Sequence, residues 1–187
     1  KNLVADGCRE EAMVMGSIWL SYIGEAAIPQ LIPLLGNDNY RLAMFAAKTL
    51  SGIEGSLSHI RKAMKSENPA IRLHAVGALQ FFGPEAVEVM PDLSDFIKSE
   101  IIKSGKQETG NIPEAAGIAA GALGKIGETA IPVAADLLGS NNANIRLAGV
   151  AVLSRIGKSG ISLLQEALKK ERDQLLVKAI QGTINSL

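Results

Sequence analysis

The sequence predicts an all-α protein in which about six similar helical hairpins stack as an α-solenoid. Two observations lead to this class. Hydrophobic residues make up 47% of the 187-residue chain while aromatic residues make up only 4%, and a composition rich in Ala, Leu and Ile favours closely packed helices over β-sheets. In addition, one short pattern of small and large apolar residues recurs about every thirty residues. Such periodicity is typical of a repeat architecture.

The recurring pattern is centred on a leucine. Leu20, Leu50, Leu79, Leu123 and Leu153 follow one another at intervals of 30, 29, 44 and 30 residues. A small residue stands four positions before each leucine and a larger apolar residue three positions after it, so the three would share one face of a helix. The small residues are Gly16, Ala46, Ala75, Ala119 and Gly149, and the larger ones are Ile23, Ile53, Phe82, Ile126 and Ile156.

The ends of this helix carry local signals as well. A glycine follows the large apolar residue in four units, where a helix end needs a residue that tolerates positive φ. These glycines are Gly24, Gly83, Gly127 and Gly157. Upstream, Asn37, Asn68 and Asn142 each stand four residues before an arginine and are predicted N-caps, and Pro69 suits a first helical position. Another helix precedes the turn, as at residues 27–35 and 130–138. Each unit is therefore predicted to be a helix, a polar turn and a second helix.

These features together resemble a known repeat. Ala-Ile-Pro at a helix start, an Asn-rich turn, Ile-Arg-Leu, a small residue and a final Leu with Ile-Gly are similar to the short HEAT-like repeat of bacterial HEAT-repeat proteins and of phycobilisome-lyase-type repeats. The resemblance covers roughly residues 8–187. It implies a single solenoid domain over residues 1–187, a right-handed superhelix whose second helices line the concave side. Arg41, Arg72 and Arg146 match the arginine that HEAT repeats often carry in the second helix, while Asn mostly replaces their Asp near the turn.

The fourth unit is longer than the others by about 14 residues, because 44 residues separate Leu79 from Leu123. We expect an insertion around residues 98–111. The first helix of this unit would run from Pro84 through Ile102, an exposed loop would follow at residues 104–111, and the second helix would restart at Asn111. Two interpretations are compatible with this insertion: a surface loop that merely tolerates extra length, and an irregular loop that carries specificity.

Composition and motifs give no sign of catalysis. The 19 basic residues balance 19 acidic ones, which argues against an undiscriminating nucleic-acid binder. A single cysteine, Cys8, excludes an internal disulfide framework and a multi-cysteine zinc site. No apolar run approaches the ~20 residues that span a bilayer. His59 and His74 lie in different predicted helices. We predict no catalytic residue, no cofactor and no metal, and we expect Trp19 to pack in the core or at the N-terminal cap.

The variable face of the second helices is the candidate recognition surface. Positions five and two before each anchor leucine, and two after it, share a stripe away from the repeating core. We predict that this stripe lines or borders the concave groove, apolar toward the N-terminal end and cationic toward the C-terminal end. The candidate partner-binding residues are Met15, Ile18, Tyr22, Phe45, Lys48, His74, Phe81, Lys125 and Arg155. The same spacing is compatible with Met15, Ile18 and Phe45 packing between units.

The leading functional expectation is a non-enzymatic interaction scaffold whose concave face binds a peptide or partner helix, with Lys125 and Arg155 attracting acidic groups. The resemblance to phycobilisome-lyase-type repeats implies a second class, a lyase or chaperone that handles a bulky ligand. A third class is a nucleic-acid-binding HEAT-like protein. That class needs a strongly basic groove, which the balanced charge does not favour.

Overall fold

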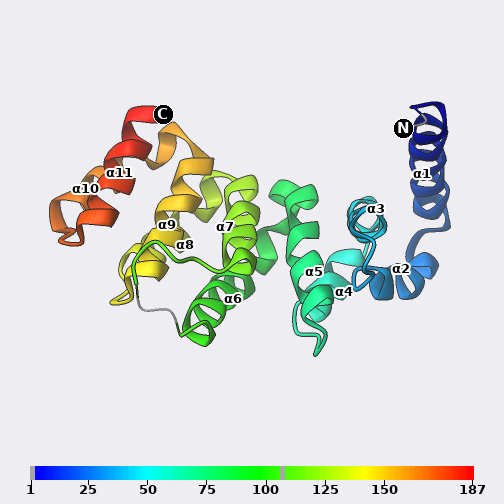
Figure 1. Cartoon of the computed structure of the whole chain (residues 1–187), viewed down its shortest axis with the longest axis horizontal. Coiled ribbons are helices and arrows are strands. Elements are labelled where there is room, and N and C mark those ends of the chain that lie inside the picture. Colours follow the sequence, from blue (N-terminus) through cyan, green and yellow to red (C-terminus); the bar gives the residue numbers. More distant parts are fainter. Residues whose placement is uncertain (1–2, 106–107) are drawn as a thin grey trace. The chain divides into compact units, whose positions relative to one another are not determined.

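The computed structural model describes residues 3–105 and 108–187, and for residues 3–12 only the backbone. Every regular element in these ranges is a helix, as the all-α prediction requires (Figure 1). Within these ranges, no helix combines the length and hydropathy of a membrane-spanning segment. The α-helices are α1 (Leu3–Ile23), α2 (Ile28–Leu34), α3 (Tyr40–Ser51), α4 (Ser56–Ala63), α5 (Pro69–Phe82), α6 (Met90–Lys103), α7 (Glu114–Ile126), α8 (Ile131–Leu138), α9 (Ala143–Ile156), α10 (Ile161–Lys170) and α11 (Gln174–Ser186). Short 3-10 helices, η1 (Gly24–Ala27), η2 (Gly83–Val89), η3 (Glu128–Ala130) and η4 (Lys158–Gly160), lead into α2, α6, α8 and α10.

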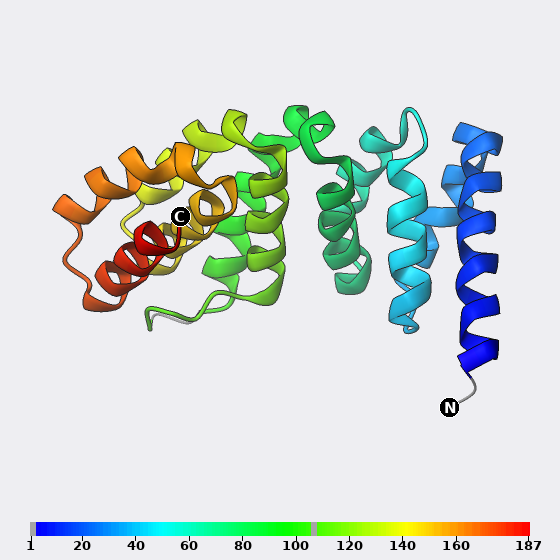
Figure 2. The ribbon, with the colours of Figure 1, turned by 90° about the horizontal axis from the view of Figure 1, so that it is seen from above.

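The chain divides into two compact units, residues 1–81 and 82–187. In the first unit α1 packs on α3, and α2 packs on both α3 and α4. Figure 2 shows α1, in blue, running alongside α3, in light blue. In the second unit α6 packs on α7, both α7 and α8 pack on α9, and α11 packs on α9 and α10.

The predicted core register is confirmed in the four helical repeats after the first. Leu50, Leu79, Leu123 and Leu153 are all fully buried, and burying a leucine side chain contributes about 1.5–3 kcal/mol. The small residues four positions earlier are buried too, namely Ala46, Ala75, Ala119 and Gly149. Leu20, the anchor of the first helical repeat, is only half-buried.

The predicted glycine helix ends are also confirmed. Gly24, Gly83, Gly127 and Gly157 have φ of 69°, 54°, 92° and 92°, a region that residues with a Cβ rarely adopt. The chain therefore leaves four helices through a glycine of positive φ, as the sequence pattern indicates.

Two of the three predicted N-caps are confirmed. The Asn68 side chain accepts a hydrogen bond from the Ala70 amide at 2.9 Å, and Asn142 accepts from the amides of the second and third residues after it. The prediction for Asn37 is wrong. Its side chain instead accepts from the Asn39 amide at 2.9 Å, and Asn39 caps α3 by accepting from the Arg41 amide at 3.1 Å.

The fourth unit differs from its prediction at two helix starts. Residues 83–89 form η2, so the α-helix predicted to run from Pro84 begins only at Met90. The second helix, α7, begins at Glu114 rather than at Asn111. Pro113 precedes it with φ −57° and ψ 144°, and an extended residue of this kind ends the loop instead of continuing a helix.

Trp19 corrects a further prediction, because it is 65% exposed on α1 and does not pack in the core. Its neighbours on the same helical face are exposed as well, and among the described residues no helix covers that face. Cys8 belongs to α1, but its side chain lies outside the described part of the structure.

Candidate partner-binding site

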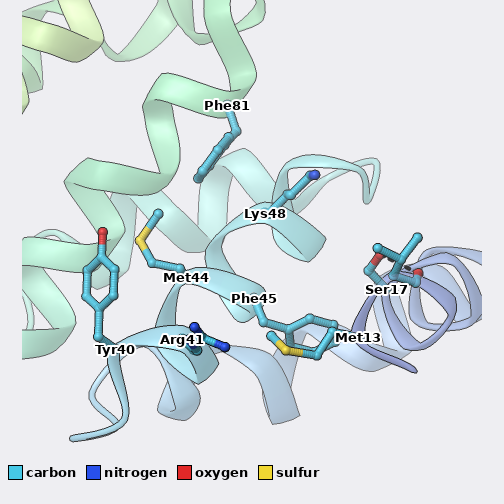
Figure 3. Close-up of a pocket in the computed structure, with 9 residues that line it drawn as sticks. Met13, Ser17, Tyr40, Arg41, Met44, Phe45, Lys48 and Phe81 are labelled. Carbon is cyan, nitrogen blue, oxygen red and sulfur yellow. Dashed lines mark hydrogen bonds between the residues drawn. The ribbon is translucent and has the colours of Figure 1, made fainter. Parts of the chain in front are cut away.

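The first unit contains an apolar cleft of about 450 Å³, a volume typical of ligand-binding sites. Figure 3 shows the cleft between side chains of α1, α3 and α5. Its walls are formed mainly by thioether, aliphatic and phenyl groups, while a phenol, a hydroxyl and two cations complete the lining. The lining residues are Met13, Val14, Ser17, Tyr40, Arg41, Met44, Phe45, Lys48 and Phe81.

Helical spacing explains why α3 supplies most of this lining. Arg41, Met44 (or Phe45) and Lys48 follow one another at intervals of three and four residues, which places them on one face of the helix. The Asn39 side chain caps α3, which begins at Tyr40, so Tyr40 and Arg41 lie in its first turn. On α1, a Cβ at Gly16 would lie 3.6 Å from the Phe45 ring, so the ring lies close to the α1 backbone.

Arg72 and Arg146 donate hydrogen bonds to the turn before their own helix, whereas the arginine at the cleft does not. Arg72 donates from Nη1 to the carbonyl oxygens of Ser66 and Glu67 at 2.8 and 3.0 Å. Arg146 donates in the same way to the turn that precedes its own helix. The exposed Arg41 side chain makes no comparable bond to a described residue. Its guanidinium is therefore available at the cleft for an external acceptor.

Lys48 supplies a second cation to the same lining and is also exposed. Among the described residues, neither it nor Arg41 is paired with a carboxylate. Two unpaired positive charges on one side of an apolar cleft favour a ligand that combines an apolar group with a negative one. Because the charges are exposed, salt will screen this attraction over about 10 Å at 0.1 M.

Three of the predicted recognition residues line this cleft: Phe45, Lys48 and Phe81. His74 lies in the same unit but has a structural setting. Its Nδ1 is 2.7 Å from the Leu35 carbonyl oxygen, and its ring lies 5.9 Å from the ring of Tyr40, centroid to centroid. The histidine therefore supports the tyrosine that borders the cleft.

The other predicted residues lie elsewhere. Met15, Ile18 and Tyr22 are exposed on α1 but are not part of the cleft lining. Lys125 and Arg155 are exposed in the second unit, on α7 and α9. The exposure of Met15 and Ile18 rules out the interpretation that they pack between units, and the part of all five residues in binding stays a prediction.

Six lining residues were missed by the sequence pattern, and two of them carried a usable signal. Val14 and Met44 each stand six positions before their anchor leucine, next to the predicted stripe on the helix surface. Extending the stripe by that position would have found both. The remaining four, which no repeat position predicts, are Met13, Ser17, Tyr40 and Arg41.

The second unit has a recess of about 480 Å³ near the start of α11, lined in part by Arg146, Glu166, Lys170 and Glu171. Two of its charges form an ion pair. Arg146 donates from Nε and Nη2 to the two carboxylate oxygens of Glu171 at 2.8 and 3.1 Å, and this hydrogen bonding lowers the pKa of Glu171. The recess thus holds an internal ion pair beside the further charges of Glu166, Lys170 and Arg172, whereas neither cation of the cleft is paired with a described carboxylate.

Within the described residues, no three His, Cys, Asp or Glu side chains gather closely enough to hold a metal ion. Comparison with known proteins adds no assignment, because neither a protein-family model nor a curated protein matches the chain.

Proposed function

We propose that the protein is a non-enzymatic interaction scaffold of HEAT-like helical hairpins. The repeat register supports the hairpin architecture, because buried leucines, left-handed glycines and arginines bonded to their own turns recur along the chain. The cleft of α1, α3 and α5 is the binding site. It takes a peptide or partner helix that inserts a large apolar side chain and presents an acidic group nearby.

One observation carries this proposal: apolar walls and unpaired cations occur in the same cleft. Met44, Phe45 and Phe81 provide the apolar surface, and burying an apolar anchor there supplies most of the affinity. Arg41 and Lys48 select among apolar ligands by favouring those with Asp or Glu beside the anchor. An amphipathic helix or an extended peptide with this composition meets both requirements.

Selection from a phage-displayed library of random 16-residue peptides tests the proposal on the full chain. Enriched peptides should combine a large apolar residue with nearby acidic residues. Charge reversal in the Arg41→Glu/Lys48→Glu variant should weaken a selected synthetic peptide at least about tenfold, or ~1.4 kcal/mol, and should reduce the salt dependence of its binding. Phe81→Ala, at a 43% exposed position, should also weaken it.

The matched control is Lys169→Glu/Lys178→Glu, which reverses two exposed cations of residues 82–187 that are not among the predicted binding residues. Binding of the selected peptide should be nearly unchanged in this variant. The proposal fails if no peptide is enriched over the unselected library. It also fails if the selected peptides bind the Arg41→Glu/Lys48→Glu chain as tightly as the original, provided that circular dichroism shows the variant folded.

A further inference from the structure

The two cations of the cleft belong to one helix, α3, and their spacing along it is fixed (Figure 3). Arg41 and Lys48 are seven residues apart, which corresponds to about 10.5 Å along a helix axis. Seven residues also complete nearly two turns, so the two side chains leave α3 within about 20° of the same direction. A ligand that pairs with both cations must therefore carry two negative groups about 10 Å apart.

The apolar part of α3 lies between these two charges. Met44 and Phe45 stand three and four residues after Arg41, and Lys48 follows four and three residues after them. Both apolar side chains line the cleft, and Phe81 of α5 adds a phenyl group that is 43% exposed. Along α3 the cleft thus presents a cation, an apolar pair and a second cation. A complementary ligand presents an acid, an apolar pair and a second acid in the same order.

The side chains of the cleft offer hydrogen-bond donors but few acceptors. Arg41 and Lys48 can only donate. None of the nine lining residues is Asp, Glu, Asn or Gln. The side-chain oxygens of the lining are the hydroxyls of Ser17 and Tyr40, and the Ser17 hydroxyl already donates to the Val14 carbonyl oxygen at 2.8 Å. The N–H groups of an extended peptide across the cleft would therefore find at most two side-chain oxygens as partners.

The backbone of the lining adds little to this supply. All nine lining residues belong to α-helices, whose N–H and C=O groups bond mainly to one another. Near the ends of α3, the Arg41 amide donates to the Asn39 side chain at 3.1 Å, and the Lys48 carbonyl oxygen accepts from the Ser51 hydroxyl at 2.8 Å. An extended peptide would leave N–H groups unpaired where the cleft excludes water, whereas an α-helix bonds its own.

We propose that the cleft takes an amphipathic α-helix that lies along α3 and pairs two acidic side chains, seven residues apart, with Arg41 and Lys48. The apolar side chains three and four residues after the first acid contact Met44 and Phe45. This pattern reads the same in both chain directions, so it holds for a parallel and for an antiparallel occupant. The inference rests on the proposed function, and it selects the helix over the extended peptide.

Three fluorescein-labelled peptides of 16 residues test the inference on the full chain. The first, in an Ala/Gln background, has glutamate at peptide positions 5 and 12, phenylalanine at position 8 and leucine at position 9. The second moves the later glutamate to position 10, which turns it by about 140° around the helix. The third is an extended comparator in which prolines flank Glu-Phe-Leu-Glu, because three extended residues also separate the acids by about 10 Å.

Fluorescence anisotropy should show that the first peptide binds at least about tenfold more tightly than each of the other two, or ~1.4 kcal/mol. Circular dichroism should show a gain of helix in this peptide on binding. Restoring the spacing matters only if both acids have partners, so replacing the second glutamate by glutamine should weaken the first peptide about threefold.

The contribution of the second glutamate should vanish in the Lys48→Ala chain, where only one cation of the pair is left. This expectation holds for either direction of the bound helix, because a single acid can pair with Arg41 in both. The matched control is Lys62→Ala on α4, which removes an exposed cation that does not line the cleft. That variant should keep the difference between the peptides with one and two glutamates.

The inference is overturned if the extended comparator or the peptide with the shifted glutamate binds as tightly as the first peptide. It is also overturned if the second glutamate strengthens binding equally in a folded Lys48→Ala chain. Failure of the first peptide to bind a chain that binds the phage-selected peptides has the same meaning. These outcomes leave the cleft as a peptide site, whereas the absence of any enriched peptide in the phage selection rejects the proposed function itself.

Discussion

Two glycines of α7 differ in their surroundings although they lie seven residues apart on one helix. A Cβ at Gly124 would overlap the Cβ of Arg155 on α9, whereas a Cβ at Gly117 would meet nothing within 4 Å. Gly124 thus allows a close approach of α7 and α9, whereas Gly117 has no such contact and lowers helix stability relative to alanine.

Alanine substitutions should therefore have opposite effects at these two positions. Gly124→Ala should lower the free energy of unfolding by about 1–3 kcal/mol, because the helices must separate. Gly117→Ala should raise it by about 0.5–1 kcal/mol through helix propensity. Urea unfolding monitored by circular dichroism measures both values. A stabilised Gly124→Ala variant would contradict the close approach of α7 and α9.

The Arg146–Glu171 pair makes stability depend on pH. The carboxylate is only 8% exposed, and hydrogen bonding to Arg146 lowers its pKa in the folded state. The stabilisation is therefore fully present above the ordinary glutamate pKa of about 4.3. It is lost as the pH falls through the lowered folded-state pKa.

Replacing this carboxylate should remove that pH dependence. Glu171→Gln should cost about 1.5–3 kcal/mol at pH 7, the range for hydrogen bonds to a charged group, and should flatten the stability profile between pH 5 and 3. Asp136→Asn is the matched control, because its pair with Lys98 is exposed at 63% on the Asp side. That variant should lose less than about 1 kcal/mol. Equal losses in both variants would show that burial of Glu171 is not the cause.

At the residue scale, the sequence predicted the buried positions better than the exposed ones. Leu50 and Leu123 have the small and apolar partners that a core requires, and both are fully buried. Trp19 has an equally apolar side chain and yet is 65% exposed. The repeat pattern specifies which face of a helix is apolar, but whether another helix covers that face depends on tertiary neighbours.

At the element scale, the inserted segment of the fourth repeat is hydrogen-bonded to α9 and to the N-cap residue of α11. Asn144, which is only 1% exposed, accepts from the amides of Gly110 and Asn111 at 3.0 and 3.3 Å and donates to the Glu108 carbonyl at 3.0 Å. Thr109 donates to the Asp173 carboxylate at 2.6 Å, which lowers the pKa of that group. The end of the loop is therefore held by partly buried polar contacts.

Removing the amide side chain should release this part of the loop. In Asn144→Ala, the Gly110 and Asn111 amides lose their acceptor, and their hydrogen exchange should accelerate at least about tenfold, equivalent to ~1.4 kcal/mol of local opening. Ser99→Ala, whose hydroxyl bonds only within its own helix, should leave both amides unaffected. Unchanged exchange in Asn144→Ala would show that other contacts hold the loop.

The sequence predicted the position of this insertion but not the hydrogen bonds that hold it. The interval of 44 residues between Leu79 and Leu123 placed the extra residues correctly. Asn144, which accepts from the amides of Gly110 and Asn111, lies 34 and 33 residues after them in the chain. Contacts over such distances leave no local pattern, whereas helix ends such as Gly127 do.

At the scale of the whole molecule, the chain has two compact units with separate buried leucines. A cavity in one unit should therefore loosen that unit first. Leu123→Ala should cost about 2–5 kcal/mol, with hydrogen exchange accelerating more in residues 82–187 than in residues 13–81. Leu50→Ala should show the reverse. Uniform acceleration in both variants would mean that the chain opens as a single cooperative unit.

The cleft was only partly predictable for a related reason. Repeat positions led to Phe45, Lys48 and Phe81, because these follow from the helical register. Arg41 stands nine residues before its anchor leucine, whereas Arg72 and Arg146 stand seven before theirs, so Arg41 lies two positions nearer the start of its helix. Its role depends on how α3 begins at Asn39, two residues later than the pattern indicated.

Gly127 and Gly157 have nearly the same backbone conformation, and this similarity affects how a repeat could be removed from the chain or duplicated in it. Their φ and ψ values, 92° and −149° against 92° and −146°, are nearly the same, and each leads through a 3-10 turn into the next short helix. Removing residues 128–157, or copying them in tandem, would join the chain through a glycine of unchanged conformation. Duplication or loss of a whole unit at this point therefore needs no new turn, which gives the gene a simple route to longer or shorter variants.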